Sequence, residues 1–427
     1  MAYEGNAATL MADGTIERDG FAMQVFYYSL SLIILGVGFL KANISSLVGE
    51  LYKKGDARRD SGFTIFYMGI NLGSIFATII CAYLGETYGW SYGFGAAGIG
   101  MLLGLATFIL GKKHFHGKGE PRDLAQLKKT VVFGLDTEKI IYILAVLSTL
   151  AFWQMVQRHS VVEGLLMVSG SISLIFIVWY AATKSTRIER NRLIALTILI
   201  LFSVFFWALF EQAYSSLNLF ADRAMNRDLG GSTIAPGMFL SLNGIFIVLF
   251  APFFAWLWVK LAKRKRNPNA AIKFGFALLF VGLGFGALVF GINTSGLGKV
   301  SMIWLVLAYL LHTFGELCLS PVGLSYVTKL APAKIIGFMM GVWFLATAGS
   351  EYIAGLLANI ASIKVVPGEV ADLELAKSSY SHLFETLFYI GIIVGILLLI
   401  ISPLIKKMMH GIDEENEETL EAEASEL

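Results

Sequence analysis

Residues 304–323 read Trp-Leu-Val-Leu-Ala-Tyr-Leu-Leu-His-Thr-Phe-Gly-Glu-Leu-Cys-Leu-Ser-Pro-Val-Gly. The stretch is apolar and long enough to cross a membrane as a helix, for which roughly 20 residues suffice. Glu316 lies in its interior. A carboxylate at that depth is costly, so it normally faces a bundle interior or a water-filled cavity and marks a pathway for a substrate, an ion or a proton. The stretch therefore predicts a transport protein.

Similar apolar stretches recur along the whole chain of 427 residues, of which 56% are hydrophobic. Hydropathy predicts eleven transmembrane helices, at 22–48, 63–86, 91–111, 138–156, 161–183, 192–221, 237–260, 271–292, 301–327, 334–362 and 383–405. A soluble fold cannot hide so much apolar surface. We therefore expect an all-α, polytopic transmembrane helical bundle.

Basic residues cluster in alternate loops, at 53–59, 112–129, 184–192, 260–266, 329–334 and 406–407. By the positive-inside rule these loops are cytoplasmic, and so is the C-terminus. The formal net charge of +2 hides eight acidic residues within 413–427, without which 33 basic residues face 23 acidic ones, a balance of +10. Such a tail is typical of a solvated, disordered end, and a regulatory role is the alternative.

The same rule leaves the N-terminus outside, although residues 1–10 lack the features of a signal peptide. We therefore expect further helices to precede this chain. Residues 138–156 and 161–183 form a charge-poor pair, which favours a lipid-facing hairpin over a substrate-lining one. The predicted organisation is the remainder of an N-terminal bundle at 1–111, a linker with the inserted helix pair at 112–191, a C-terminal six-helix bundle at 192–405 and the tail at 406–427.

Lys41 and Glu316 each lie fifteen residues from the outer end of their helix, roughly 22 Å deep. Opposite charges at one depth can pair, and a proton or a charged ligand can separate them. The pair predicts a gate on the cytoplasmic side, and a static bridge between helices is the alternative. Glu211, about 27 Å above the inner end of its helix, is expected near the outer mouth, either as a gate residue or as a wetted carboxylate.

Amides and aromatic residues supply further candidates. Asn71 and Asn243 offer a donor and an acceptor in apolar helices, which suits a peptide backbone and equally suits helix-to-helix bonding. Trp207, Trp343 and Phe344 can line side-chain pockets, but aromatic residues in membrane helices more often serve packing. His312, one turn before Glu316, can modulate its protonation, and the favoured interpretation is a satisfied core histidine.

Other classes of chemistry find no support in the sequence. It contains no phosphate-binding loop, no Cys/His metal spacing and no arrangement of nucleophile and base. We therefore expect no enzyme, no catalytic residue, no metal, no organic cofactor and no nucleic-acid partner. Cys81 and Cys318 lie inside apolar spans and indicate no disulfide.

Four ordered runs resemble the proton-dependent oligopeptide transporter (POT) family of the major facilitator superfamily. They are Gly38-Phe-Leu-Lys-Ala-Asn-Ile-Ser45, Phe63-Thr-Ile-Phe-Tyr-Met-Gly-Ile-Asn-Leu-Gly-Ser74 with Gly89-Trp90 and Gly93-Phe94, Phe206-Trp-Ala-Leu-Phe-Glu-Gln212, and Gly315-Glu-Leu-Cys-Leu-Ser-Pro-Val-Gly323. They look like the family's helices four, five, seven and ten. The resemblance spans nearly the whole chain, so its motifs are specific.

The resemblance implies proton-driven symport of di- and tripeptides by alternating access, with the proton as coupling ion. The residues it places at peptide termini are Lys41, Asn71, Asn243 and Glu316, and those it places at side-chain pockets are Trp207, Trp343, Phe344 and Thr347. Lys41 and Glu316 would form the inner gate, and Glu211 would be the outer-gate acid. The resemblance also implies a monomer in the lipid bilayer of a bacterial inner membrane.

Bacterial members with the inserted pair have fourteen helices, so three are expected upstream of this chain. The family's Glu-x-x-Glu-Arg motif of helix one does not occur in the sequence. Two other functions stay open. One is a carrier of another small anion or amino-acid-like solute, since one fold can serve several substrates. The other is a membrane fragment that does not transport.

Overall fold

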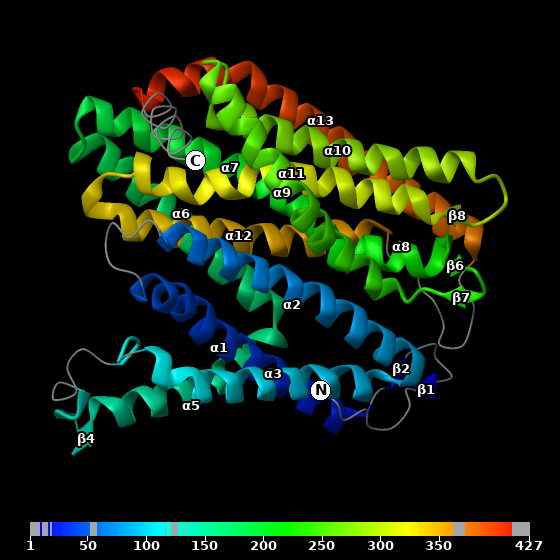
Figure 1. Cartoon of the computed structure of the whole chain (residues 1–427), viewed down its shortest axis with the longest axis horizontal. Coiled ribbons are helices and arrows are strands. Elements are labelled where there is room, and N and C mark those ends of the chain that lie inside the picture. Colours follow the sequence, from blue (N-terminus) through cyan, green and yellow to red (C-terminus); the bar gives the residue numbers. More distant parts are fainter. Residues whose placement is uncertain are drawn as a thin grey trace. The chain divides into compact units, whose positions relative to one another are not determined.

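A computed structural model describes residues 9–10, 16–17, 19–51, 58–115, 117–120, 127–132, 134–361 and 372–411. Within these ranges, eleven helices are long and apolar enough to cross a membrane, which confirms the predicted helical class (Figure 1). The α-helices are α1 (Gly20–Glu50), α2 (Arg58–Tyr88), α3 (Trp90–Gly111), α5 (Thr137–Val156), α6 (His159–Thr183), α7 (Arg187–Phe210), α8 (Ser216–Ala224), α9 (Ser241–Lys263), α10 (Ala270–Thr294), α11 (Met302–Leu330), α12 (Ile336–Ala358) and α13 (Leu373–Met409).

The remaining elements are short. The 3₁₀ segments are η1 (Lys112–Phe115), η2 (Glu211–Tyr214), η3 (Pro236–Leu240), η4 (Ala333–Ile335) and η5 (Asn359–Ala361). The strand pairs are β1 (Thr9–Leu10) with β2 (Ile16–Glu17), β3 (Thr130–Val132) with β4 (Leu135–Asp136), and β6 (Asp228–Leu229) with β7 (Ser232–Thr233), all antiparallel, and β5 (Met225–Asn226) with β8 (Val300–Ser301), parallel. These short strand pairs lie before or between the helices and form no larger sheet within the described residues.

The chain forms two compact units, residues 1–163 and 164–427. In the first unit, α2 and α3 pack as a tight hairpin, and α5 packs on α1. Gly89 makes the turn of the hairpin with φ 111°, a conformation that favours glycine. A Cβ at Gly93 would lie 2.8 Å from the carbonyl oxygen of Cys81 and 3.1 Å from Cα of Gly85. Small residues thus let the two backbones approach closely, as is common between membrane helices.

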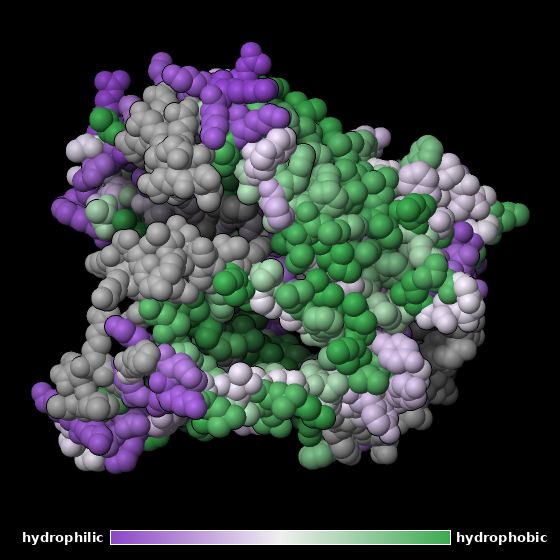
Figure 2. All heavy atoms as spheres, in the orientation of Figure 1, coloured by the Kyte–Doolittle hydropathy of each residue, from purple (hydrophilic) through white to green (hydrophobic). Residues whose placement is uncertain are grey.

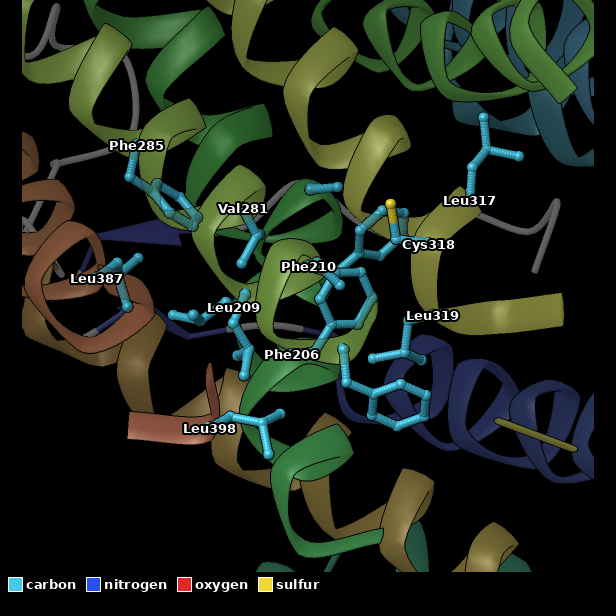
Figure 3. Packing of buried hydrophobic residues seen from close by; sticks show 14 of the residues in the cluster. Phe206, Leu209, Phe210, Val281, Phe285, Leu317, Cys318, Leu319, Leu387 and Leu398 are labelled. Atoms are coloured by element: carbon cyan, nitrogen blue, oxygen red, sulfur yellow. The ribbon is translucent and has the colours of Figure 1, made fainter. Parts of the chain in front are cut away.

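In the second unit, α10 packs along both α11 and α13. A Cβ at Gly391 of α13 would lie 2.7 Å from Cα of Gly282 in α10, so these two backbones are also nearly in contact. Figure 3 shows the apolar core beside them, where side chains of α7, α10, α11 and α13 meet. The labelled residues are Phe206, Leu209, Phe210, Val281, Phe285, Leu317, Cys318, Leu319, Leu387 and Leu398.

Large apolar side chains also cover the outer faces of the helices. Leu102, Leu103 and Leu110 of α3 and Ile175 of α6 are among those that stay exposed. Figure 2 shows such apolar side chains spread over the visible face and hydrophilic ones gathered near helix ends. A soluble monomer rarely exposes so continuous an apolar surface, whereas lipid covers it at no cost.

Two boundaries differ from the sequence prediction. The span predicted at 192–221 is interrupted, because α7 ends at Phe210 and η2 precedes α8. The last helix begins at Leu373 and not near 383, so part of the predicted loop 363–382 is helical. Its first turns are polar, and hydropathy therefore misses them. Lys377 within them is buried and donates hydrogen bonds from Nζ to the carbonyl oxygens of Gly296 (2.6 Å) and Gly298 (3.1 Å).

The predicted domain boundaries at 111 and 191 stay a prediction, and the tail beyond 411 lies outside the described residues. The expected lipid-facing pair corresponds to α5 and α6. Leu144 and Val146 of α5 and Ile172 of α6 are exposed, while Phe176 of α6 packs on Phe338 of α12 with ring centroids 4.5 Å apart.

Candidate functional site

The carboxylate of Glu316 on α11 meets the amide of Asn243 on α9. Nδ2 of Asn243 donates a hydrogen bond to Oε2 of Glu316 at 2.8 Å, and it also lies 3.2 Å from Oγ1 of Thr313. Both Asn243 and Glu316 are half-buried, and Thr313 is fully buried. A hydrogen bond to an ionised group is roughly twice as strong as a neutral one. The structure thus brings together two residues that the sequence singled out separately.

Tight packing holds the segment of α11 that carries Glu316. A Cβ at Gly315 would lie 2.8 Å from the carbonyl oxygen of Ala277 in α10 and 3.0 Å from Cε2 of Phe206 in α7. On the far side of Glu316, Cys318 and Leu319 are completely buried. The adjacent residues Gly315 and Glu316 therefore have linked roles. Gly315 lets three helices pack closely, and this packing fixes the backbone from which Glu316 presents its carboxylate.

The predicted residues of α7 lie at the point where this helix ends. Trp207 packs edge-on against Phe206 and Phe210, with centroids 5.2 and 5.4 Å apart. Its Nε1 is buried and has no hydrogen-bond partner in the part of the chain that the structure describes. Glu211 is the C-cap residue of α7 and begins η2. Its expected position near the outer mouth stays a prediction.

Gln212 received no role from the sequence, yet it fixes the break after α7. It is fully buried, and its Nε2 donates to the carbonyl oxygen of Ala354 in α12 at 2.9 Å. Its Oε1 accepts from the hydroxyl of Ser216 at 2.7 Å. The sequence does contain a signal for this role. Gln212, Ser215 and Ser216 are three polar residues close together inside an apolar span, and such residues often form hydrogen bonds between membrane helices.

The three predicted residues of α12 have different environments. Trp343 is buried and its ring packs directly onto Gly323 of α11. Phe344 is 56% exposed within its unit. The hydroxyl of Thr347 donates to the carbonyl oxygen of Trp343 at 3.2 Å. The packing of Trp343 shows how a predicted pocket residue also serves as a contact between helices, and the pocket role of all three stays a prediction.

The remaining predicted residues belong to the first unit. Asn71 of α2 is buried. Lys41 belongs to α1, but its side chain lies outside the described part of the structure. The two units are described separately, so the gate contact between Lys41 and Glu316 stays a prediction. In the described residues, no three His, Cys, Asp or Glu side chains gather in a way that would hold a metal ion.

His312 is packed as a core residue. It is 1% exposed, and its ring lies 4.8 Å from that of Phe285. Its Nε2 is 3.1 Å from the carbonyl oxygen of Val281. Since a carbonyl only accepts, Nε2 carries the proton and donates. Nδ1 is buried and has no partner among the described atoms, so the histidine is only half satisfied.

Comparisons with known proteins agree with this architecture. The POT family model matches residues 5–370. The peptide transporter YePEPT of Yersinia enterocolitica is 36% identical over 408 residues, which cover 92% of this chain and 77% of that protein. A di-/tripeptide transporter of Lactococcus lactis is 35% identical over 404 residues, covering 92% of this chain and 78% of that protein.

Solved structures match as well. A crystal structure of a peptide transporter POT in complex with sulfate is 37% identical with a TM-score of 0.74, covering 92% of this chain and 77% of the other. A POT family transporter in complex with 5-aminolevulinic acid is 29% identical with a TM-score of 0.70, covering 90% and 80%. The family model and the relatives both extend over most of the sequence, and the chain therefore belongs to the POT family.

Proposed function

We propose that this protein transports di- and tripeptides across a membrane as a proton-coupled symporter that works by alternating access. Its relatives include proteins named peptide transporters and di-/tripeptide transporters, at 35–36% identity. The eleven long apolar helices within the described residues indicate an integral membrane protein. The observation that carries the proposal is the bond of 2.8 Å between Asn243 and Glu316, since it presents a carboxylate and an amide together inside the second unit.

The chemistry of a short peptide suits this pair. A peptide carries an ammonium group at one end, a carboxylate at the other and amide groups between them. Glu316 offers carboxyl oxygens that can accept a hydrogen bond from the ammonium group, and Oδ1 of Asn243 offers an acceptor to the amide groups of the peptide. Lys41 would bind the carboxylate end. Asn71 would contribute a second amide, while Trp207, Trp343, Phe344 and Thr347 would surround the side chains.

Coupling follows from the ability of Glu316 to lose its charge. When Glu316 is ionised, it holds Lys41 and keeps the inner gate closed. A proton on Glu316 removes that attraction, and the peptide carboxylate then competes for Lys41, so the gate opens only when both proton and peptide are present. Glu211 would be the acid of the outer gate. No other cofactor is needed, because the proton gradient supplies the free energy.

We also propose a membrane orientation, a location and an oligomeric state for the transporter. The alternate basic loops put the C-terminus in the cytoplasm. The match to a relative from the Gram-negative bacterium Yersinia enterocolitica supports placement in a bacterial inner membrane. A monomer would suffice, because substrate and proton sites lie within one chain.

Uptake into proteoliposomes tests the proposal. Labelled dipeptide should accumulate when an inward pH gradient is imposed and should stop when a protonophore collapses it. Glu316→Gln keeps the shape and the hydrogen bond to Asn243 but cannot ionise, so gradient-driven accumulation should be lost while exchange of peptide across the membrane persists. Glu374→Gln, at an exposed residue in the first turn of α13, is the control for the same chemical change. Unchanged accumulation in Glu316→Gln would rule out the coupling role.

A second substrate class has a specific observation in its favour. The POT family transporter solved with 5-aminolevulinic acid shares the fold of this chain. That ligand carries an ammonium and a carboxylate group, as a dipeptide does. Competition of unlabelled 5-aminolevulinic acid against labelled dipeptide separates the two substrate classes, since a peptide-selective carrier would show no inhibition.

A further inference from the structure

A small cavity lies beside the Asn243–Glu316 pair, inside the second unit. Its walls are Phe210, Ala213, Tyr214, Leu240, Asn243, Tyr309 and His312. The space open to the centre of a water molecule is about 10 Å³. This is close to the minimum for one water, which needs on the order of 10–15 Å³ and two to four polar partners.

The polar atoms around this cavity have complementary roles. Nδ1 of His312 accepts, because Nε2 carries the proton that is donated to Val281. Oδ1 of Asn243 also accepts, since Nδ2 already faces Glu316 and Thr313. The hydroxyl of Tyr309 can donate, and so can that of Tyr214, which also lines the cavity. Nδ1 of His312 is buried and has no hydrogen-bond partner in the described part of the chain, and the residues His312 and Tyr309 are 1% and 3% exposed.

A buried polar atom without a partner costs roughly 1–3 kcal/mol, so the unpaired Nδ1 of His312 favours a ligand in the cavity that donates a hydrogen bond to it. Water has two hydrogen atoms to donate and a lone pair to accept with. One molecule can therefore donate to His312 and Asn243 and accept from Tyr309. An apolar ligand would leave Nδ1 of His312 unsatisfied, and larger polar molecules exceed the volume.

We propose that this cavity is a binding site for a single water molecule, held by His312, Tyr309 and Asn243, and that this water fixes the orientation of the Asn243 amide. An amide that flips exchanges its oxygen and nitrogen. With the water donating to Oδ1, the flipped amide would place two donors, NH₂ and the water's O–H, against each other. It would also place two acceptors, the amide oxygen and the Glu316 carboxylate, against each other, so the water favours the observed orientation. His312 and Tyr309 are thus positioning residues that act on the substrate pair through the water.

This inference rests on the proposed function only for its effect on transport, and the water site itself is tested without transport. The full chain is labelled with ¹⁵N-histidine and reconstituted in nanodiscs. The ring signals of His312 are assigned from those that disappear in His312→Gln. A cross-peak between water and this ring is expected, together with a hydrogen-bonded Nδ1 whose ¹⁵N shift changes in Tyr309→Phe.

Tyr380→Phe is the matched control, because Tyr380 is also buried and its hydroxyl accepts from Arg223 at 3.4 Å, away from the cavity residues. It should leave the His312 shift unchanged. A His312 ring with no water cross-peak, or a Nδ1 shift that Tyr309→Phe leaves in place, would overturn the water site.

The positioning role is measured by peptide uptake. Tyr309→Phe should raise KM about three- to tenfold, as expected for losing one hydrogen bond, while kcat stays close to the parent value. Equal KM values in the parent and in Tyr309→Phe would overturn the positioning role. If the parent chain shows no peptide uptake at all, the proposed function fails, and the NMR result still decides whether the water is bound.

Discussion

Nε2 of Gln212 lies 2.9 Å from the carbonyl oxygen of Ala354, so the break after α7 is tied to the backbone of α12. Gln212 is completely buried and accepts a further bond from Ser216. It thus joins α12, η2 and the start of α8 through one side chain. A break in a membrane-spanning helix frees backbone groups, and polar side chains of this kind satisfy them.

Gln212→Leu should therefore destabilise the protein although it adds apolar volume. The carbonyl oxygen of Ala354 and the hydroxyl of Ser216 would stay buried without their present partner, at a cost of about 1–3 kcal/mol. The midpoint of thermal unfolding in detergent should fall by several degrees. Gln24→Leu is the control, because Gln24 is exposed and its side chain, within the described residues, bonds only to Gln157, at 3.3 Å. Equal midpoints for the two variants would show that the tie contributes no stability.

Asn243→Ala should weaken peptide binding more than turnover. Without the donated bond of 2.8 Å, the Glu316 carboxylate loses the group that orients it. Hydrogen bonds to charged groups contribute about 1.5–3 kcal/mol, so KM should rise about tenfold or more. The measurement is initial uptake of a labelled dipeptide over a range of concentrations.

Asn226→Ala is the control for that variant, because Asn226 is exposed on β5 and its side chain, in the described structure, accepts a hydrogen bond only from the backbone N–H of the nearby Asp228. Its KM should equal that of the parent. A normal KM in Asn243→Ala would instead assign the Asn243–Glu316 bond to helix packing alone.

The sequence predicted much of this site because the membrane makes polar residues conspicuous. Glu316 and Asn243 are visible as isolated polar groups in apolar spans, and a buried polar group needs a reason. For Asn243 the sequence left two interpretations, substrate contact or a bond between helices. The structure shows that Asn243 forms a hydrogen bond between helices and that its acceptor is Glu316. Glu316 is itself a predicted substrate contact, so both interpretations of Asn243 involve the same pair of residues.

Other features depend on contacts that no pattern encodes. The break after α7 requires Gln212 to meet Ala354, a residue far away in the sequence. The early start of α13 requires Lys377 to reach two carbonyl oxygens of the loop after α10. Hydropathy averages over windows, so it merges a broken helix into one span and assigns a polar helix to a loop.

Gly391→Ala tests the close approach of α10 and α13 with the smallest possible change. The new Cβ would lie 2.7 Å from Cα of Gly282 and 3.0 Å from the carbonyl oxygen of Leu278, atoms of a backbone that cannot rotate away. Overpacking of this kind costs typically about 1–3 kcal/mol. Alanine is otherwise the better helix former by about 1 kcal/mol. Packing and helix propensity therefore change the free energy of unfolding in opposite directions.

Gly104→Ala, in the interior of α3, isolates the propensity term, because none of the described atoms lies within 4 Å of the added Cβ. The midpoint of thermal unfolding should stay level or rise in Gly104→Ala and should fall by several degrees in Gly391→Ala. The double variant Gly282→Ala/Gly391→Ala should lose more than either single change, since both methyl groups enter the same contact. A Gly391→Ala protein as stable as the parent would mean that α10 and α13 can separate freely, and the close helix contact would then not hold the unit together.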